Sequence, residues 1–219
     1  MLSELLRRIK HDVTYRIKLF LYVTFIFNVA YSVFLFIISQ IYSSKWFFIL
    51  ALYYGLLSVI RIFVYLQLPP QKQLVSKIKT MLICGYFLLL LNLIYSIMAF
   101  VLISENNALS HHEIIVITLA TYTFTTLTIA IINGIKYLRK NDYLHTCIKI
   151  ISLISASVSL VALTNTMLST FGDNNLSLRN IILPILSIFV SIFIILCAFF
   201  MIYKANLNLR TLKNEKNRQ

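Results

Sequence analysis

Long apolar runs separated by short polar segments dominate the sequence. A helix needs roughly 20 apolar residues to cross a hydrocarbon core of about 30 Å, whereas a barrel strand needs about half as many. Backbone groups inside lipid must also be hydrogen-bonded within each segment, which favours helices. The pattern therefore predicts six transmembrane helices, at residues 18–39, 46–66, 81–103, 114–135, 147–170 and 181–203.

These runs predict an all-α polytopic membrane protein that forms a six-transmembrane-helix bundle. We divide the chain into a basic cytoplasmic leader at 1–17, a transmembrane domain at 18–203 and a basic cytoplasmic tail at 204–219. Apolar residues of the leader recur at helical spacing, opposite Arg7 and Arg8, as in an amphipathic helix on the membrane surface. The alternative is that these residues are a basic segment that only fixes the orientation of the first span in the membrane.

The basic residues are distributed very unevenly between the two sides of the predicted bundle. Of the 20 Lys and Arg residues, 18 fall on one side, and only Lys45 and Arg179 fall on the other. By the positive-inside rule this asymmetry predicts a multi-pass protein of the cell membrane with both termini in the cytoplasm. The net charge of +13 then indicates attraction to anionic lipids of the inner leaflet, and not nucleic-acid binding.

A polar motif, Asn-x-x-Tyr-Ser, occurs twice within the apolar runs, in FNVAYS and again 64 residues later in LNLIYS. The second and fourth spans correspond less clearly, at an offset of 69. These correspondences predict a parallel repeat of a helical hairpin, with spans one and two matching spans three and four. Whether spans five and six form a third copy of the hairpin is left open.

The two asparagines lie at similar depth, about ten residues into their spans. A lipid-facing amide there would leave its polar atoms without partners, so we expect both to face the interior and bond a neighbouring helix. Two interpretations remain: packing between helices, or an interior polar track. The candidate residues of the track are Asn28, Tyr31, Ser32, Asn92, Tyr95, Ser96 and Tyr122.

The second span carries a polar stripe, in which Tyr54, Ser58 and Arg61 fall at i, i+4 and i+7. Arg61 is the one permanent charge that lies more than three residues from the end of a span. Because it is close to the predicted cytoplasmic end, its side chain has the length to extend to the interface. The alternative is contact with an anion or a lipid headgroup.

Acidic residues are confined to the segments outside the six spans. Proton relays and intramembrane cation sites usually need ionisable side chains, and metal-dependent proteolysis or phosphotransfer needs acidic or histidine ligands. We therefore predict no enzyme activity and no cofactor. His111, His112 and Glu113 stand together, but adjacent residues on a helix point in different directions, so we assign no metal site and leave metal binding there open.

Three stretches of the chain are similar to segments of a known group of membrane proteins. They are SKWFFILALYYGLLSVIRIF at 44–63, ATYTFTTLTIAIINGIKYLRK at 120–140 and KIISLISASVSL at 149–160. The chain resembles an uncharacterised family of small six-helix membrane proteins from low-GC Gram-positive anaerobes, which implies the fold and no activity. The first two spans are also weakly similar to cation diffusion facilitators. That family places His and Asp ligands in its second and fifth helices, whereas this chain has Tyr53, Tyr54 and Ser58 in the second.

Two classes of function remain. The first is a transporter-like bundle whose neutral interior suits a small neutral or polar solute or a lipid. The second is a non-catalytic scaffold whose basic ends dock a protein partner or anionic lipid, with a homo-oligomer left open. Composition does not separate the two classes.

Overall fold

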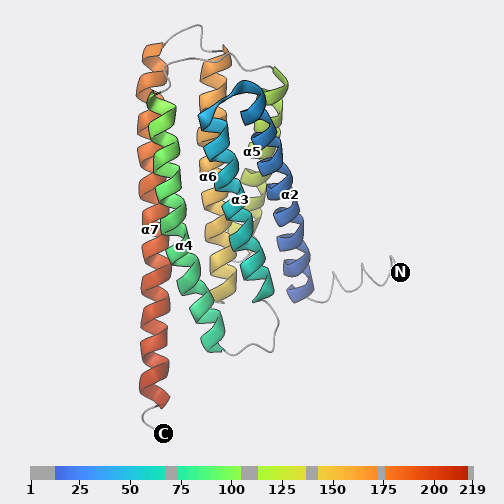
Figure 1. Ribbon diagram of the computed structural model, residues 1–219. Coiled ribbons are helices and arrows are strands. Elements are labelled where there is room, and N and C mark those ends of the chain that lie inside the picture. Colours follow the sequence, from blue (N-terminus) through green and yellow to red (C-terminus); the bar gives the residue numbers. More distant parts are fainter. Residues whose placement is uncertain (1–12, 68–73, 105–112, 137–142, 172–175, 217–219) are drawn as a thin grey trace, which may run out of the picture.

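The computed structural model describes residues 13–67, 74–104, 113–136, 143–171 and 176–216. These residues form six helices, each long and apolar enough to cross a membrane, and no strand occurs among them (Figure 1). The chain is therefore an all-α, multi-pass integral membrane protein, which confirms the predicted fold class. The helices are α2 (Val13–Tyr42), α3 (Lys45–Leu66), α4 (Leu74–Ser104), α5 (Glu113–Lys136), α6 (Tyr143–Phe171) and α7 (Leu176–Lys216).

The helices are longer than the apolar runs that predicted them. Helix α2 begins at Val13, inside the predicted leader, while residues 1–12 lie outside the described part of the chain. Helix α7 continues to Lys216, so most of the predicted tail is an extension of this helix. Residues 204–216 contain no Gly or Pro, and Leu209 and Leu212 pack against the core, so nothing ends the helix at the end of the apolar run.

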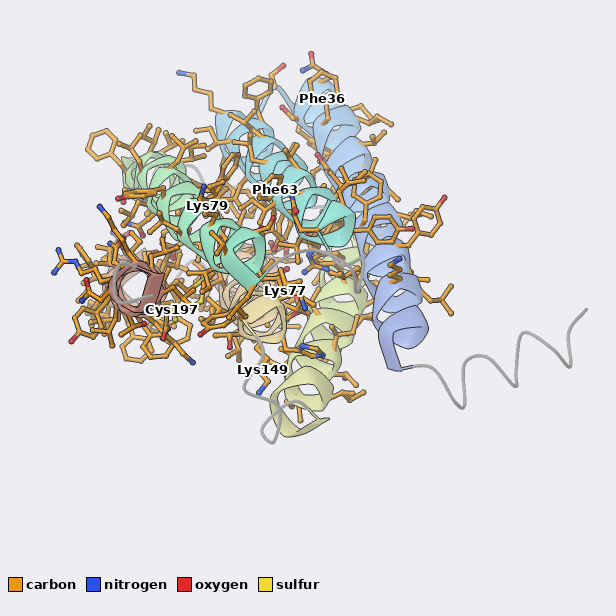
Figure 2. All side chains as sticks on the ribbon, turned by 90° about the horizontal axis from the view of Figure 1, so that it is seen from below. Phe36, Phe63, Lys77, Lys79, Lys149 and Cys197 are labelled. Atoms are coloured by element: carbon orange, nitrogen blue, oxygen red, sulfur yellow. The ribbon has the colours of Figure 1, made fainter. Side chains whose placement is uncertain are left out.

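The helices pack most closely in three pairs: α2 with α3, α4 with α7, and α5 with α6. Helix α6 also contacts α3 and α4, and α3 and α6 separate the α4–α7 pair from α2 and α5 (Figures 1 and 2). Within the described ranges α4 and α5 do not pack together as α2 and α3 do. The packing therefore does not reproduce the predicted repeat of a two-helix hairpin, because α4 pairs with the last helix and not with the next one.

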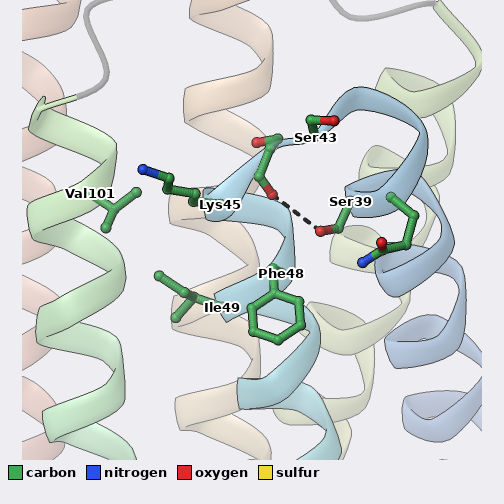
Figure 3. A pocket seen from close by; sticks show the side chains of 8 residues that line it. Ser39, Ser43, Lys45, Phe48, Ile49 and Val101 are labelled. Carbon is green, nitrogen blue, oxygen red and sulfur yellow. Dashed lines mark hydrogen bonds between the residues drawn. The ribbon is translucent and has the colours of Figure 1, made fainter.

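Helices α2 and α3 form a tight hairpin. Ser43 in the turn has φ 50°, a left-handed conformation that is uncommon for a residue with a side chain. The Ser44 backbone N–H donates to the Ser39 carbonyl at 3.2 Å, and Ser39 Oγ donates to the Ser44 carbonyl at 3.2 Å (Figure 3). Further along, Ser32 Oγ donates to the Ala51 carbonyl at 2.7 Å. These bonds set the register of α2 against α3.

Helices α4 and α7 approach each other closely at Gly85. A Cβ atom at this position would lie 2.7 Å from Ile202 Cγ1 and 3.3 Å from the Ala198 carbonyl oxygen, so there is no room for a side chain. Small residues permit such close backbone approach between helices in membranes, where packing takes the place of the hydrophobic effect. The α4–α7 pair is thus a closely packed unit.

The described charges gather at one end of the bundle, which we call the basic end. It contains the start of α2, α4 and α6 and the end of α3, α5 and α7, and it is the lower end in Figure 1. Figure 2 views the molecule from this end and labels Lys77, Lys79 and Lys149. At the opposite end, Lys45 is the one basic side chain that the structure describes.

Candidate functional site

Three tyrosines from three helices meet in the interior. The rings of Tyr31 on α2 and Tyr122 on α5 are stacked, with centroids 3.5 Å apart and planes 4° from parallel. Tyr54 on α3 presents an edge to both rings, at 4.9 Å from Tyr31 and 5.2 Å from Tyr122. All three side chains are buried. We call Tyr31, Tyr54, Tyr122 and the adjoining Asn28 the tyrosine centre.

Asn28 connects α2 to α5 at this centre. Its side chain is 1% exposed, and Tyr122 Oη donates a hydrogen bond to Asn28 Oδ1 at 2.8 Å. This confirms the expectation that Asn28 faces the interior and bonds a polar group of a neighbouring helix. In the described ranges the α2 and α5 backbones do not pack closely along their lengths. The two helices are therefore joined here by long side chains, through one ring stack and one hydrogen bond.

The aromatic contacts continue from the tyrosine centre toward α4. Tyr53 lies edge-on to Tyr54 with ring centroids 5.6 Å apart, and Tyr95 on α4 lies 6.4 Å from Tyr53. Tyr53 and Tyr54 were not among the candidate residues of the track. The signal for Tyr54 was the polar stripe that it shares with Ser58 and Arg61, whereas Tyr53 is adjacent to that stripe and has no comparable signal.

Several buried polar atoms in and beside the tyrosine centre have no hydrogen-bond partner. Each belongs to a group that can donate a hydrogen bond, and each unmet group of this kind costs roughly 1 to 3 kcal/mol. Such atoms are rare in folded proteins, and their concentration in one place points to a ligand or ordered water. They are Asn28 Nδ2 and the hydroxyls of Tyr31, Tyr53, Tyr54 and Tyr95.

A seam of small hydroxyl residues between α5 and α6 adjoins the centre. Thr123 Oγ1 donates to the Ser159 carbonyl at 3.1 Å, and Thr126 Oγ1 lies 3.0 Å from Ser159 Oγ. Ser159 and Ser155 stand next to Tyr54 and Tyr122, respectively. Thr123, Thr126 and Ser159 therefore hold α5 against α6 beside the tyrosine centre, whereas Ser155 Oγ has no hydrogen-bond partner.

The remaining candidate residues of the track lie elsewhere. Asn92 is half-buried between α4 and α7, where Ser191 Oγ donates to Asn92 Oδ1 at 3.0 Å, so its expected bond to a neighbouring helix is confirmed. Ser96 is exposed and bonds the Asn92 carbonyl of its own helix. Ser32 bonds the α3 backbone. The seven candidates therefore do not form one continuous track.

Arg61 is buried inside the bundle on the basic-end side of the tyrosine centre. Its side chain is only 4% exposed, so it does not extend to the surface as the interface interpretation expects. Its Nε has no hydrogen-bond partner. The hydroxyls of Tyr54 and Tyr122 lie within electrostatic range of its guanidinium. No carboxylate is found among the side chains that the structure describes.

One surface depression lies beside the ring stack, and another lies at the opposite end of the bundle. A groove of about 530 Å³ runs between α2 and α5 and is lined by Phe27, Ala30 and Thr118, with Tyr31 and Tyr122 among its walls. A second depression of about 410 Å³ lies at the opposite end of the bundle, where it is lined by residues of the α2–α3 turn and by Val101 of α4 (Figure 3). Tyr31 and Tyr122 are buried, so the first depression reaches the ring stack from the face of the bundle between α2 and α5.

Among the described residues no three His, Cys, Asp or Glu side chains come together in a way that could hold a metal ion. His111 and His112 lie outside the described residues, as does the Glu113 side chain, so metal binding at these positions stays open.

Comparison of the chain with protein-family models, with curated proteins and with solved structures gave no match. The resemblance to small six-helix membrane proteins therefore stays a prediction.

Proposed function

We propose that this membrane protein is a carrier for a small polar solute, which binds at the tyrosine centre. The observation that carries the proposal is the group of buried, unpartnered donors on Asn28, Tyr31, Tyr53 and Tyr54. In a bundle that served packing alone, these hydroxyls would cost stability without any return, because phenylalanine fills the same space. A solute rich in hydrogen-bond acceptors would satisfy them.

The packing of the helices supports movement around this centre. Carriers work by displacing one group of helices against another around a central site. The α4–α7 pair is closely packed at Gly85, whereas α2 meets α5 through a ring stack and one hydrogen bond beside a groove. The weaker contact is the one expected to open. Catalysis is not part of the proposal, because the six spans contain no carboxylate.

The orientation in the membrane belongs to the proposal. The basic end faces the cytoplasm of a cell membrane, with both termini inside and anionic lipid headgroups around it. Single cysteines at Asn107 and Asn175, compared with Val75 and Asn214, test this in intact cells after the native cysteines are replaced. We expect an impermeant thiol reagent to label the first pair only; labelling of the second pair from outside would reverse the orientation.

The transport proposal is tested with purified protein in proteoliposomes and a panel of small neutral and polar solutes, with flux followed by light scattering. Asn28→Leu is expected to abolish flux, with a loss of stability no larger than the about 1 kcal/mol expected for its hydrogen bond to Tyr122. Asn92→Leu is the matched control, because Asn92 occurs in the same motif but bonds Ser191 between α4 and α7. Its flux per folded molecule should be unchanged. If Asn28→Leu lowers stability and leaves flux intact, Asn28 serves packing and the proposal fails.

A scaffold that docks anionic lipid or a protein partner is the second candidate, and the basic extension of α7 favours it. Arg210 and Lys213 are exposed beyond the predicted span, on a helix that continues to Lys216. In nanodiscs, phosphatidylglycerol should then raise thermal stability, and Arg210→Gln with Lys213→Gln should remove the rise. Absence of flux for every solute, together with this lipid effect, would favour the scaffold.

A further inference from the structure

Arg61 extends toward the tyrosine centre from the basic end. It lies five residues before the end of α3 at Leu66, which is roughly 8 Å along the helix axis. The Cα–Cβ bonds of a helix tilt toward its N-terminus, so this side chain leaves the backbone in the direction of the opposite end. Its burial and its closeness to Tyr54 and Tyr122 agree with that direction.

A buried guanidinium needs a compensating charge. Isolated charges away from water are so costly that buried ones are normally paired or bind a ligand. Arg61 Nε has no partner, and the structure describes no carboxylate side chain that could serve as counter-ion. Charged residues within membrane bundles generally mark the path of an ion or substrate. Within the described part of the chain the compensating charge is therefore left for a ligand to supply.

We infer that Arg61 is the binding residue of an interior oxyanion site, in which its guanidinium holds one carboxylate or phosphate group of the ligand. The inference rests on the proposed carrier function and names its substrate class, a small polar solute with a single oxyanion group. Tyr54 Oη, which lacks a partner, supplies a second donor for the same group. The planar guanidinium fork matches the two oxygens of such a group, whereas a spherical halide offers no such match.

The charge at the basic end suits an anion. Lys77 and Lys149 are half-buried at the basic end, and Lys79 is exposed there (Figure 2). Lys18 and Lys204 are also half-buried. A mouth of one charge sign raises the local concentration of ions of the opposite sign. An oxyanion approaching from this end therefore meets surface lysines first and the buried Arg61 next. The oxyanion can belong to a soluble solute or to a phospholipid headgroup.

Binding is measured as the rise in melting temperature of the full-length protein in neutral detergent. Inorganic phosphate and acetate are compared with chloride at constant ionic strength, and phosphatidylglycerol with phosphatidylcholine. At a ligand concentration 100 times Kd we expect a rise of roughly 5 to 10 °C. A rise with phosphate or acetate identifies a soluble ligand, and a rise with phosphatidylglycerol alone identifies the headgroup. No rise above the chloride and phosphatidylcholine values would overturn the inference.

Variants separate binding from a structural role of Arg61. Arg61→Met should lose the oxyanion-dependent rise while its melting temperature in chloride stays at or above that of the wild type, because an uncompensated charge has been removed. Arg61→Lys keeps the charge without the fork and should weaken binding about tenfold. Arg210→Met, at an exposed arginine of α7, is the control and should keep the full rise. A fall in the stability of Arg61→Met with the rise retained would make Arg61 structural.

Flux in proteoliposomes distinguishes failure of the inference from failure of the carrier proposal. If oxyanions bind through Arg61 but no solute crosses the membrane, the site stands and the carrier proposal fails. If neutral solutes cross and oxyanions have no effect on stability or flux, the carrier proposal stands and the oxyanion site is wrong.

Discussion

The α4–α7 pair and the tyrosine centre each contain one copy of the Asn-x-x-Tyr-Ser motif, but the hydrogen bonding of the asparagine differs between them. At α4–α7, Asn92 is half-buried and accepts a hydrogen bond from Ser191, and Gly85 allows close backbone approach. At the tyrosine centre, Asn28 is fully buried, and its amide nitrogen lacks a partner. Similar residues therefore complete the packing in one region and leave polar capacity unused in the other.

This comparison shows how a small helical bundle can contain both a rigid helix pair, here α4–α7, and a candidate binding site, here the tyrosine centre. Close backbone packing and satisfied hydrogen bonds favour one arrangement of α4 and α7. Long aromatic side chains hold α2 and α5 together across a wider gap, where burial without hydrogen bonding lowers stability. Proteins commonly give up stability at functional sites and recover it elsewhere. The following predictions test whether the two regions differ in this way.

The largest effect is expected at the closest helix contact. Gly85→Ala forces Ile202 to move and should lower the free energy of unfolding by about 1 to 3 kcal/mol. Gly55→Ala is the matched control, because a Cβ there would meet only Ser32 Oγ, at an ordinary 3.4 Å. Melting temperatures in detergent measure both variants. Equal losses would mean that the α4–α7 contact is no closer than the α2–α3 contact.

Removal of an unpartnered hydroxyl should stabilise the protein. Tyr53→Phe deletes a buried Oη without a hydrogen bond and should raise the free energy of unfolding by about 1 kcal/mol. Tyr122→Phe deletes the donor to Asn28 and should lower it by about 1 kcal/mol. Thermal unfolding in the absence of ligand compares the two. A loss of stability in Tyr53→Phe would show that its hydroxyl is already satisfied, for example by water.

The hydrogen bond between Asn92 and Ser191 should contribute modestly to stability, so the effects of substituting the two residues should depend on each other. Asn92→Leu and Ser191→Ala should each lower stability, and the double variant should reveal a coupling of about 0.6 kcal/mol, as is usual for hydrogen bonds between helices in membranes. A double-mutant cycle of melting temperatures measures the coupling. Strictly additive losses would indicate that the hydrogen bond does not stabilise the α4–α7 pair.

The smallest effect is expected in the turn between α2 and α3. Ser43 adopts φ 50°, which glycine accepts without strain, so Ser43→Gly should raise stability by about 0.5 kcal/mol. Ser44→Gly is the control, because Ser44 has an extended φ of −92° and gains nothing from the change. A rise in melting temperature for both variants would show that the left-handed conformation is not the cause.

The sequence by itself determined the number and type of the helices. An apolar run long enough to cross a membrane has one stable backbone solution, because each of its hydrogen bonds must be made within the segment. The same need for hydrogen-bond partners applies to a side-chain amide in the middle of a span. It explains why Asn28 and Asn92 both form a hydrogen bond with a neighbouring helix. Local rules of this kind need no knowledge of which helix lies alongside.

Only the tertiary structure decided which helices are neighbours. A polar stripe indicates which face of a helix turns inward but not which helix covers it, so the α4–α7 pairing and the separation of Asn92 from Asn28 could not be predicted. The same limit applies to Arg61. Its position near a helix end allows extension to the interface, and its burial beside Tyr54 and Tyr122 follows only from how α3 packs within the bundle.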